Sequence, residues 1–236
     1  FKMMLAVQYL TNIIFLVERI MKKQAVIFDM DGVLIDSEPF YLKNIREFLE
    51  RYGGHADESL MKAIAGASRA RTWRLVAQMW KEKAEAEEVE RIFRAEYGPH
   101  HAPYREVMFP EVPELLKRLR EKGMTLAIAS SSSDESIGNM MRETGISQYF
   151  SLTVSGQNFR ESKPNPEVYL YTLSRLGLPA EACIVVEDST YGIQAAKRAG
   201  LQVAARRDER FSFDQSEADY IIERTGDIEK ILEKIG

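Results

Sequence analysis

Short apolar runs recur along the chain and predict an α/β fold. Runs of this length, buried on both faces, are typical of parallel strands. We predict strands at Gln24–Met30, Thr125–Ala129, Leu152–Val154, Cys183–Val186, Val203–Ala205 and Tyr220–Ile222. Apolar residues between these runs fall at helical spacing, which predicts helices at Val112–Lys122 and starting near Asp134, Pro166, Thr190 and Asp227. This alternation indicates a Rossmann-like, doubly wound parallel sheet.

One long segment interrupts the alternation. From about Pro39 to Tyr97 the apolar residues keep helical spacing and no strand-like run occurs. We therefore expect an all-helical cap at residues 39–107, inserted after the first strand of an α/β core formed by residues 22–38 and 108–236. Such a cap would lie above the carboxyl edge of the sheet, where ligands of these folds bind.

The first residues need a separate interpretation. Met3–Val17 is largely apolar, but polar residues interrupt it, and no small-residue cleavage site follows. A spanning helix needs about 20 apolar residues. We interpret residues 1–21 as an N-terminal extension outside the fold, with Met21 as the natural start, and a helix on a membrane surface is the alternative.

Composition and charge narrow the class of partner. The chain of 236 residues has 32 basic and 36 acidic side chains and a net charge of -4. This balance gives no electrostatic reason to expect nucleic acid or an anionic membrane as partner. The single cysteine, Cys183, lies in an apolar run and suits a reducing compartment. We expect a cytoplasmic protein acting on a small molecule, as a monomer or weak homodimer.

Two pairs of acidic residues follow two of the predicted strands. Asp29 and Asp31 end the first strand, and Glu187 and Asp188 end the run that begins at Cys183. Turn formation explains Asp31 and helix capping explains Asp188, but neither explains Asp29 after four apolar neighbours. Carboxylates gathered at one sheet edge repel each other unless a cation or shared proton intervenes. Oxygen ligands without a nearby histidine favour Mg²⁺.

Hydroxyl groups and a lysine follow other strands. Ser130 opens a serine run that includes Ser131 and Ser132, whose hydroxyls and amides, near a helix N-terminus, can hold a phosphate. Lys163 precedes Pro164-Asn165-Pro166, whose prolines restrict the backbone. A serine run is usually a loop, and a lone lysine usually lies on the surface. Function is favoured because acids, hydroxyl, lysine and acids each follow a predicted strand.

In this order the segments resemble the four motifs of the haloacid dehalogenase superfamily. The motifs are Asp29–Glu38, Ser130, Ser162-Lys163-Pro164 and Glu187-Asp188-Ser189, and the resemblance extends from about Gln24 to the C-terminus. The helical insert is similar to the cap of the beta-phosphoglucomutase-like branch. Its segment Gly66-Ala67-Ser68-Arg69 resembles that branch's substrate-facing loop, which implies substrate contacts at Gly66 and Arg69.

The resemblance implies a phosphoryl-transfer mechanism. Asp29 would be the nucleophile that forms an aspartyl-phosphate, and Asp31 would be the general acid and then base. Mg²⁺ would be held by the Asp29 carboxylate, the Asp31 backbone carbonyl and Asp188, with Glu187 close by. Lys163 and the Ser130 hydroxyl would neutralise and orient the phosphoryl oxygens. Ser131 and Ser132 would help to bind the substrate.

Several activities remain open within this resemblance. Asp31 argues against a dehalogenase, because halide needs no proton donor. Tyr41 stands where mutases of the branch have a histidine, and Asp134 in Ser132-Ser133-Asp134 would repel a second phosphate. A phospho-aspartate signalling module is the third alternative, which an insert of about 60 residues argues against. We therefore expect a phosphomonoester hydrolase acting on a small metabolite, with sugar phosphates as the branch's usual substrates, ahead of a mutase.

Overall fold

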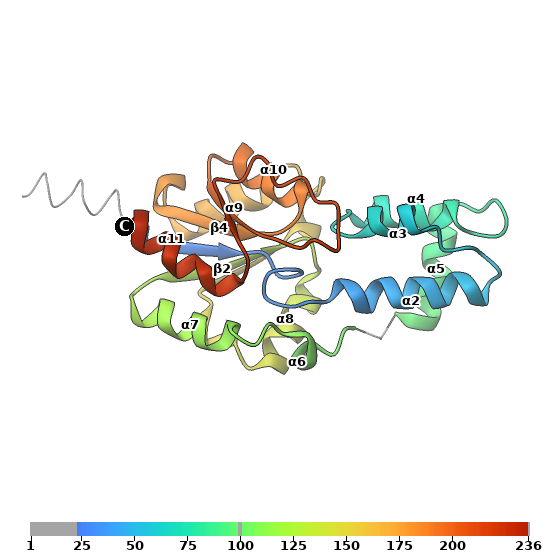
Figure 1. The fold of residues 1–236 in the computed structure, drawn as a ribbon, viewed down its shortest axis with the longest axis horizontal. Coiled ribbons are helices and arrows are strands. Elements are labelled where there is room, and N and C mark those ends of the chain that lie inside the picture. Colours follow the sequence, from blue (N-terminus) through green and yellow to red (C-terminus); the bar gives the residue numbers. More distant parts are fainter. Residues whose placement is uncertain (1–22, 99–100, 236) are drawn as a thin grey trace, which may run out of the picture.

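The computed structural model describes residues 23–98 and 101–235 (Figure 1). The expected N-terminal extension, residues 1–21, lies outside the described residues, so neither interpretation of it is tested. Within the described ranges, every helix is too short or too polar to cross a membrane.

Six parallel strands form one sheet in the order β3-β2-β1-β4-β5-β6. They are β1 (Ala25–Phe28), β2 (Thr125–Ser130), β3 (Leu152–Ser155), β4 (Cys183–Glu187), β5 (Gln202–Arg206) and β6 (Tyr220–Ile222). Phe28 pairs with Ile128 on one side and with Val186 on the other. The residues that follow β1, β2 and β4 therefore leave the sheet at the same level. The structure confirms the predicted strands and the doubly wound topology.

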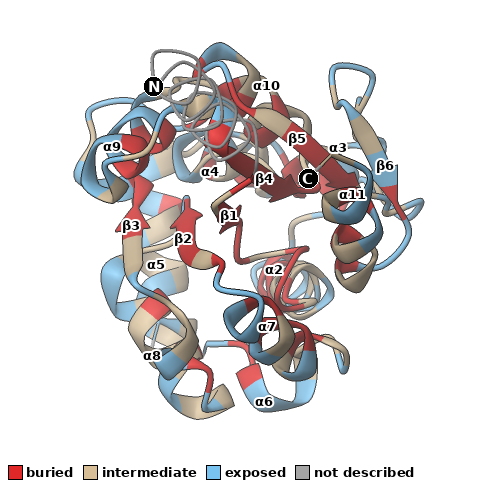
Figure 2. Ribbon diagram, turned by 90° about the vertical axis from the view of Figure 1, so that its left-hand side faces the viewer, coloured by how far each residue is buried: buried red, intermediate tan, exposed pale blue. Residues whose placement is uncertain are grey.

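Helices cover both faces of the sheet, and the strands are largely buried (Figure 2). The core helices are α7 (Val112–Glu121), α8 (Asp134–Thr144), α9 (Glu167–Leu176), α10 (Thr190–Arg198) and α11 (Ile228–Ile235). Alternate residues of β1 enter different hydrophobic clusters: Val26 and Phe28 pack on one face of the sheet, Ala25 and Ile27 on the other. Burial on both faces explains why β1 is a continuous apolar run.

In the residues that the structure describes, the insert after β1 consists of helices joined by loops, and it forms a second lobe beside the carboxyl edge of the sheet (Figure 1). Its helices are α2 (Glu38–Arg51), α3 (Glu58–Ile64), α4 (Arg69–Gln78) and α5 (Ala86–Tyr97). They enclose a separate hydrophobic cluster that includes Phe48, Trp73 and Val89. The limits predicted for the cap, residues 39–107, remain a prediction. Near the second limit, Tyr104 of α6 (Tyr104–Val107) packs in a hydrophobic cluster of the sheet.

Candidate active site

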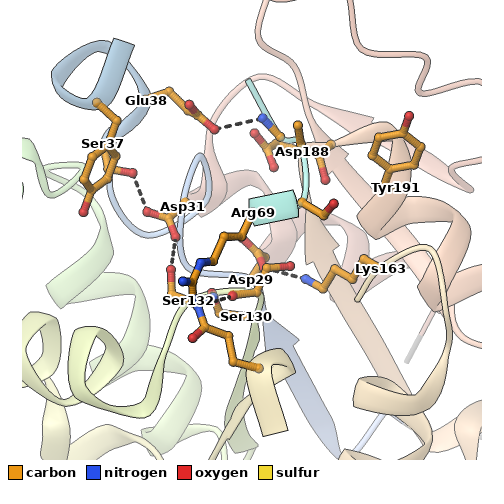
Figure 3. Close-up of a pocket in the computed structure, with 17 residues that line it drawn as sticks. Asp29, Asp31, Ser37, Glu38, Arg69, Ser130, Ser132, Lys163, Asp188 and Tyr191 are labelled. Atoms are coloured by element: carbon orange, nitrogen blue, oxygen red, sulfur yellow. Dashed lines mark hydrogen bonds and ion pairs between the residues drawn. The ribbon is translucent and has the colours of Figure 1, made fainter. Parts of the chain in front are cut away.

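A cavity of about 220 Å³ lies where the ends of β1, β2 and β4 face the cap (Figure 3). The predicted site residues that line it are Asp29, Asp31, Ser130, Ser131, Ser132, Lys163 and Asp188 from the core, and Gly66 and Arg69 from the cap. Glu187 is the one predicted site residue that does not line this cavity. The strand ends thus bring together side chains that are up to 159 positions apart in the sequence.

Gly32 allows the two acidic segments to approach each other. Its φ of +78° lies in the left-handed region, which side chains other than glycine's rarely adopt. A Cβ atom at this position would lie 2.0 Å from Asp188 Oδ2, which is an impossible contact. The Asp31-Gly32 turn therefore does more than reverse the chain, because it also makes room for the Asp188 carboxylate.

Lys163 is a buried cation shared by two carboxylates. Its Nζ donates to Asp29 Oδ1 at 2.6 Å, to Glu187 Oε1 at 2.7 Å and to the Ala129 carbonyl at 3.0 Å. Burial alone would lower the pKa of Lys163, but Asp29 and Glu187 raise it well above its ordinary value. The lysine therefore stays charged at neutral pH.

Glu187 lies behind this lysine, and its carboxylate is fully occupied. It accepts hydrogen bonds from Lys163, from the Tyr169 hydroxyl at 2.9 Å and from the backbone amides of Asp188 and Ser189. Tyr169 belongs to the apolar pattern of α9, so this contact could not be predicted from the sequence. These bonds fix Glu187 as an anchor for Lys163.

Asp188 is a buried carboxylate without a compensating partner. Among the described residues, no hydrogen bond or ion pair reaches its side-chain oxygens. Burial, Glu187 and Asp29 raise the pKa of Asp188 well above its ordinary range, and burial raises the pKa of Asp29 to about 8 although Lys163 opposes the shift. Ligand atoms of Asp29, Glu187 and Asp188 all lie within 4.8 Å of one another. The Asp29 and Asp188 carboxylates, with Glu187 close behind them, fit a hard divalent cation such as Mg²⁺.

Asp31 is held by two hydroxyl groups. Ser132 Oγ donates to its Oδ2 at 2.8 Å, and Ser37 Oγ donates to its Oδ1. Burial raises the pKa of Asp31, and both hydrogen bonds oppose the rise. Ser37 was not predicted as a site residue, although it lies within the first motif. Ser132, predicted to bind substrate, also orients Asp31.

The serine run forms a tight loop that leads into α8. Ser130 is 1% exposed, and its Oγ accepts a hydrogen bond from the Ser132 amide at 3.1 Å. Ser133 caps α8 by accepting the Ser136 amide at 3.1 Å. The hydroxyls thus lie near a helix N-terminus, which favours an anion.

The cap reaches the cavity through the loop between α3 and α4. Gly66 has a φ of +65°, and a Cβ atom there would lie 3.0 Å from both Phe213 Cε1 and Ser189 Cβ. Its amide donates to Glu38 Oε1 at 2.9 Å. Arg69 lines the cavity, but its Nε donates to Glu90 Oε1 at 2.6 Å. The sequence predicted neither partner.

Tyr41 and Asp134 bear on the choice between a hydrolase and a mutase, and the structure gives a position for each. Tyr41 lines the cavity, and burial raises the pKa of its hydroxyl, so it stays neutral. Asp134 accepts a hydrogen bond from Asn158 Nδ2 at 2.9 Å and does not line the cavity. The expectation that Asp134 repels a second phosphate therefore lacks support in this arrangement.

Comparison with known proteins finds related sequences. Residues 26–206 match the family model described as haloacid dehalogenase-like hydrolase. The chain is 33% identical over 181 residues to a phosphorylated carbohydrates phosphatase of Thermotoga maritima, covering 76% of this chain and 82% of that protein. It is 31% identical over 212 residues to a phosphoglycolate phosphatase of Aquifex aeolicus, covering 89% and 97% respectively.

A solved structure has a similar fold. It is that of a candidate beta-phosphoglucomutase from Thermotoga maritima, which superposes with a TM-score of 0.70 at 29% identity and covers 90% of this chain and 100% of that one. The chain therefore belongs to the haloacid dehalogenase-like hydrolase family, in its beta-phosphoglucomutase-like branch, and its relatives place it among the phosphatases of that family.

Proposed function

We propose that the protein is a Mg²⁺-dependent phosphomonoester hydrolase that forms an aspartyl-phosphate on Asp29. The observation that carries this proposal is the contact between the Asp29 carboxylate and Lys163 Nζ at 2.6 Å, at the wall of a cavity. Lys163 neutralises charge next to the nucleophile, where a phosphoryl group would be attacked. The residues that would hold Mg²⁺ are Asp29 and Asp188 with the Asp31 carbonyl, and the bound ion would supply further charge neutralisation on the phosphoryl oxygens.

Asp29 and Asp31 divide the proton and phosphoryl transfers between them. An Asp29 oxygen attacks phosphorus, the ester P–O bond breaks, and the leaving oxygen takes a proton from Asp31. Asp31 then takes a proton from water, whose oxygen attacks the aspartyl-phosphate and releases inorganic phosphate. The raised pKa of Asp31 supports this role, because it favours the protonated carboxyl group that donates to the leaving oxygen.

A phosphosugar mutase is the second candidate. It is favoured by the likeness to a candidate beta-phosphoglucomutase and by the position of Asp134 outside the cavity. Tyr41 argues against it, because a neutral phenol with a raised pKa cannot exchange protons as imidazole does. A signalling module is less well supported, because a helical lobe closes over the cavity.

The substrate class that we propose is a small phosphorylated metabolite, specifically a sugar phosphate. One relative is named for phosphorylated carbohydrates and another for phosphoglycolate, so the names alone do not select between these substrates. A cytoplasmic location and a monomer or weak homodimer remain predictions.

The direct test is phosphate release from a panel of phosphomonoesters with and without Mg²⁺. We expect Mg²⁺-dependent turnover that Asp29→Asn abolishes, with Glu47→Gln on the outer part of α2 as a control. Beta-glucose 1-phosphate with a bisphosphate primer tests the mutase, and isomerisation without net phosphate release would replace our proposal with that activity. No turnover of either kind would favour a signalling module.

A further inference from the structure

Glu38 is an acidic residue of the cavity that has no role in the phosphoryl transfer described above. It is the first residue of α2 and lines the same cavity as Asp29 and Lys163. Figure 3 shows its carboxylate reaching from the end of the first motif to the backbone of the cap loop. It therefore lies where the core and the cap meet, in the wall of the cavity that holds Asp29.

One oxygen of the Glu38 carboxylate is held and the other is free to accept a hydrogen bond. Oε1 accepts the Gly66 amide at 2.9 Å. From the described part of the chain, no hydrogen bond or ion pair reaches Oε2. Since the amide fixes the direction of the carboxylate, Oε2 is an oriented acceptor in a polar cavity. A partly buried acceptor of this kind favours a ligand that brings its own donor.

Two of the cations that line the cavity, Lys163 and Arg69, already have acidic partners. Lys163 binds Asp29 and Glu187, and Arg69 Nε is bonded to Glu90, which also accepts from Arg94 Nε at 2.8 Å. Burial raises the pKa of Glu38 to about 7, as expected of a carboxylate without a cationic partner. A second negative charge next to Glu38 would be repelled by its carboxylate.

We propose that Glu38 determines specificity by accepting a hydrogen bond from a hydroxyl group of the leaving alcohol, so that the site selects polyol and sugar phosphates over esters that carry a carboxylate. This inference rests on the proposed hydrolase function. It distinguishes between the two substrate classes named among the relatives, because a carbohydrate offers hydroxyl donors and glycolate offers a carboxylate. A site built around a hydrogen bond discriminates strongly against a ligand that leaves it unpaired.

A matched pair of substrates tests the inference. Glycerol 3-phosphate and 3-phosphoglycerate have the same carbon skeleton and differ in a terminal hydroxymethyl or carboxylate group. We expect kcat/KM to favour glycerol 3-phosphate by about tenfold or more in the parent protein. Glu38→Gln keeps an acceptor oxygen, removes the charge and gains a donor, so the preference should fall about tenfold. Glu47→Gln, a half-exposed acid on the same helix, should leave it unchanged.

A binding measurement keeps this test separate from the proposed function. Affinities of the same two compounds are measured by calorimetry with Mg²⁺ present, for Asp29→Asn and for Asp29→Asn combined with Glu38→Gln. If the parent protein hydrolyses no ester, the hydrolase proposal fails, yet the ratio of the two affinities still decides the role of Glu38. A preference for 3-phosphoglycerate, or a ratio that Glu38→Gln leaves within threefold, would overturn the inference. An equal loss for both compounds would indicate a purely structural contact and overturn it too.

Discussion

Ser132 Oγ lies 2.8 Å from Asp31 Oδ2 and donates a hydrogen bond to it across the end of β1 and β2. The two residues are 101 positions apart in the chain. Ser37 binds the other oxygen of the same carboxylate, so both rotation and displacement of the proposed acid/base group are restricted. Such orientation is the main contribution that side chains can make to proton transfer.

Removing the Ser132 hydroxyl should shift the pH dependence of turnover. Ser132→Ala deletes a hydrogen bond that lowers the pKa of Asp31, so that pKa should rise and the part of the pH profile that depends on ionised Asp31 should move to higher pH. We expect kcat to fall about tenfold, as for the loss of one well-placed group. Steady-state kinetics across the pH range measure both effects. Ser174→Ala, at an exposed position of α9, is the control, and an unchanged profile in Ser132→Ala would contradict the orienting role.

Removing the shared cation should affect stability as well as activity. Lys163→Met leaves Asp29 and Glu187 buried without their common partner, which typically costs about 3 kcal/mol or more. Turnover should fall by more than about a thousandfold, because charge stabilisation near the phosphoryl group is lost. Urea unfolding and kinetics test the two expectations separately. Adding Glu187→Gln to this variant should recover part of the stability without the activity, and recovery of activity would argue against the role of Lys163.

The metal-free protein should lose stability as the pH rises. Asp29 has a folded-state pKa of about 8, above its unfolded value of about 4, so its protonated form is preferred in the folded protein. Its contribution is fully present below the unfolded pKa and is lost as the pH rises through the folded pKa, between about 4 and 8. Thermal melting in chelator across this range should show the decline. Added Mg²⁺ should raise the melting temperature more at pH 8 than at pH 5, and equal shifts would argue against a carboxylate site.

Two glycines with the same backbone angle allow a controlled test of the cap loop. Gly66 and Gly177 both have φ of +65°, but a Cβ atom at Gly177 meets nothing within 4 Å. Each change to alanine should cost about 1 kcal/mol of backbone strain. Gly66→Ala should also raise KM several-fold, because the new methyl group would push the loop away from Phe213 and Ser189. If both variants kept the parent KM, the seating of this loop would not influence substrate binding.

The sequence predicted the residues that directly follow strands better than those that act through tertiary contacts. Asp29, Ser130 and Asp188 were identified because a polar residue ending a buried strand is unusual and the fold places such ends together. Tyr169 was missed because its hydroxyl comes from a helix whose apolar spacing is ordinary for a core. Glu38 was seen only as the end of a motif.

The partners of charged side chains on the surface could not be predicted from the sequence either. Arg69 was expected to bind substrate, yet the structure also gives it a partner, Glu90, on the next helix. Asp134 was expected to repel a second phosphate, but it is hydrogen-bonded to Asn158 and does not line the cavity. Charged side chains are long or accessible enough to choose among several neighbours, and the backbone pattern does not fix that choice.

The cap has a hydrophobic cluster of its own, in which residues such as Phe48 and Trp73 pack without entering the clusters of the sheet. Mutations that reshape the cap interior can therefore accumulate while the strand ends that carry the chemistry stay in register. Because of this separation, substrate preference can change through mutations in the cap alone. The separation also makes the cap a natural unit for exchange between relatives in directed evolution, with the loop at Gly66 as the junction to preserve.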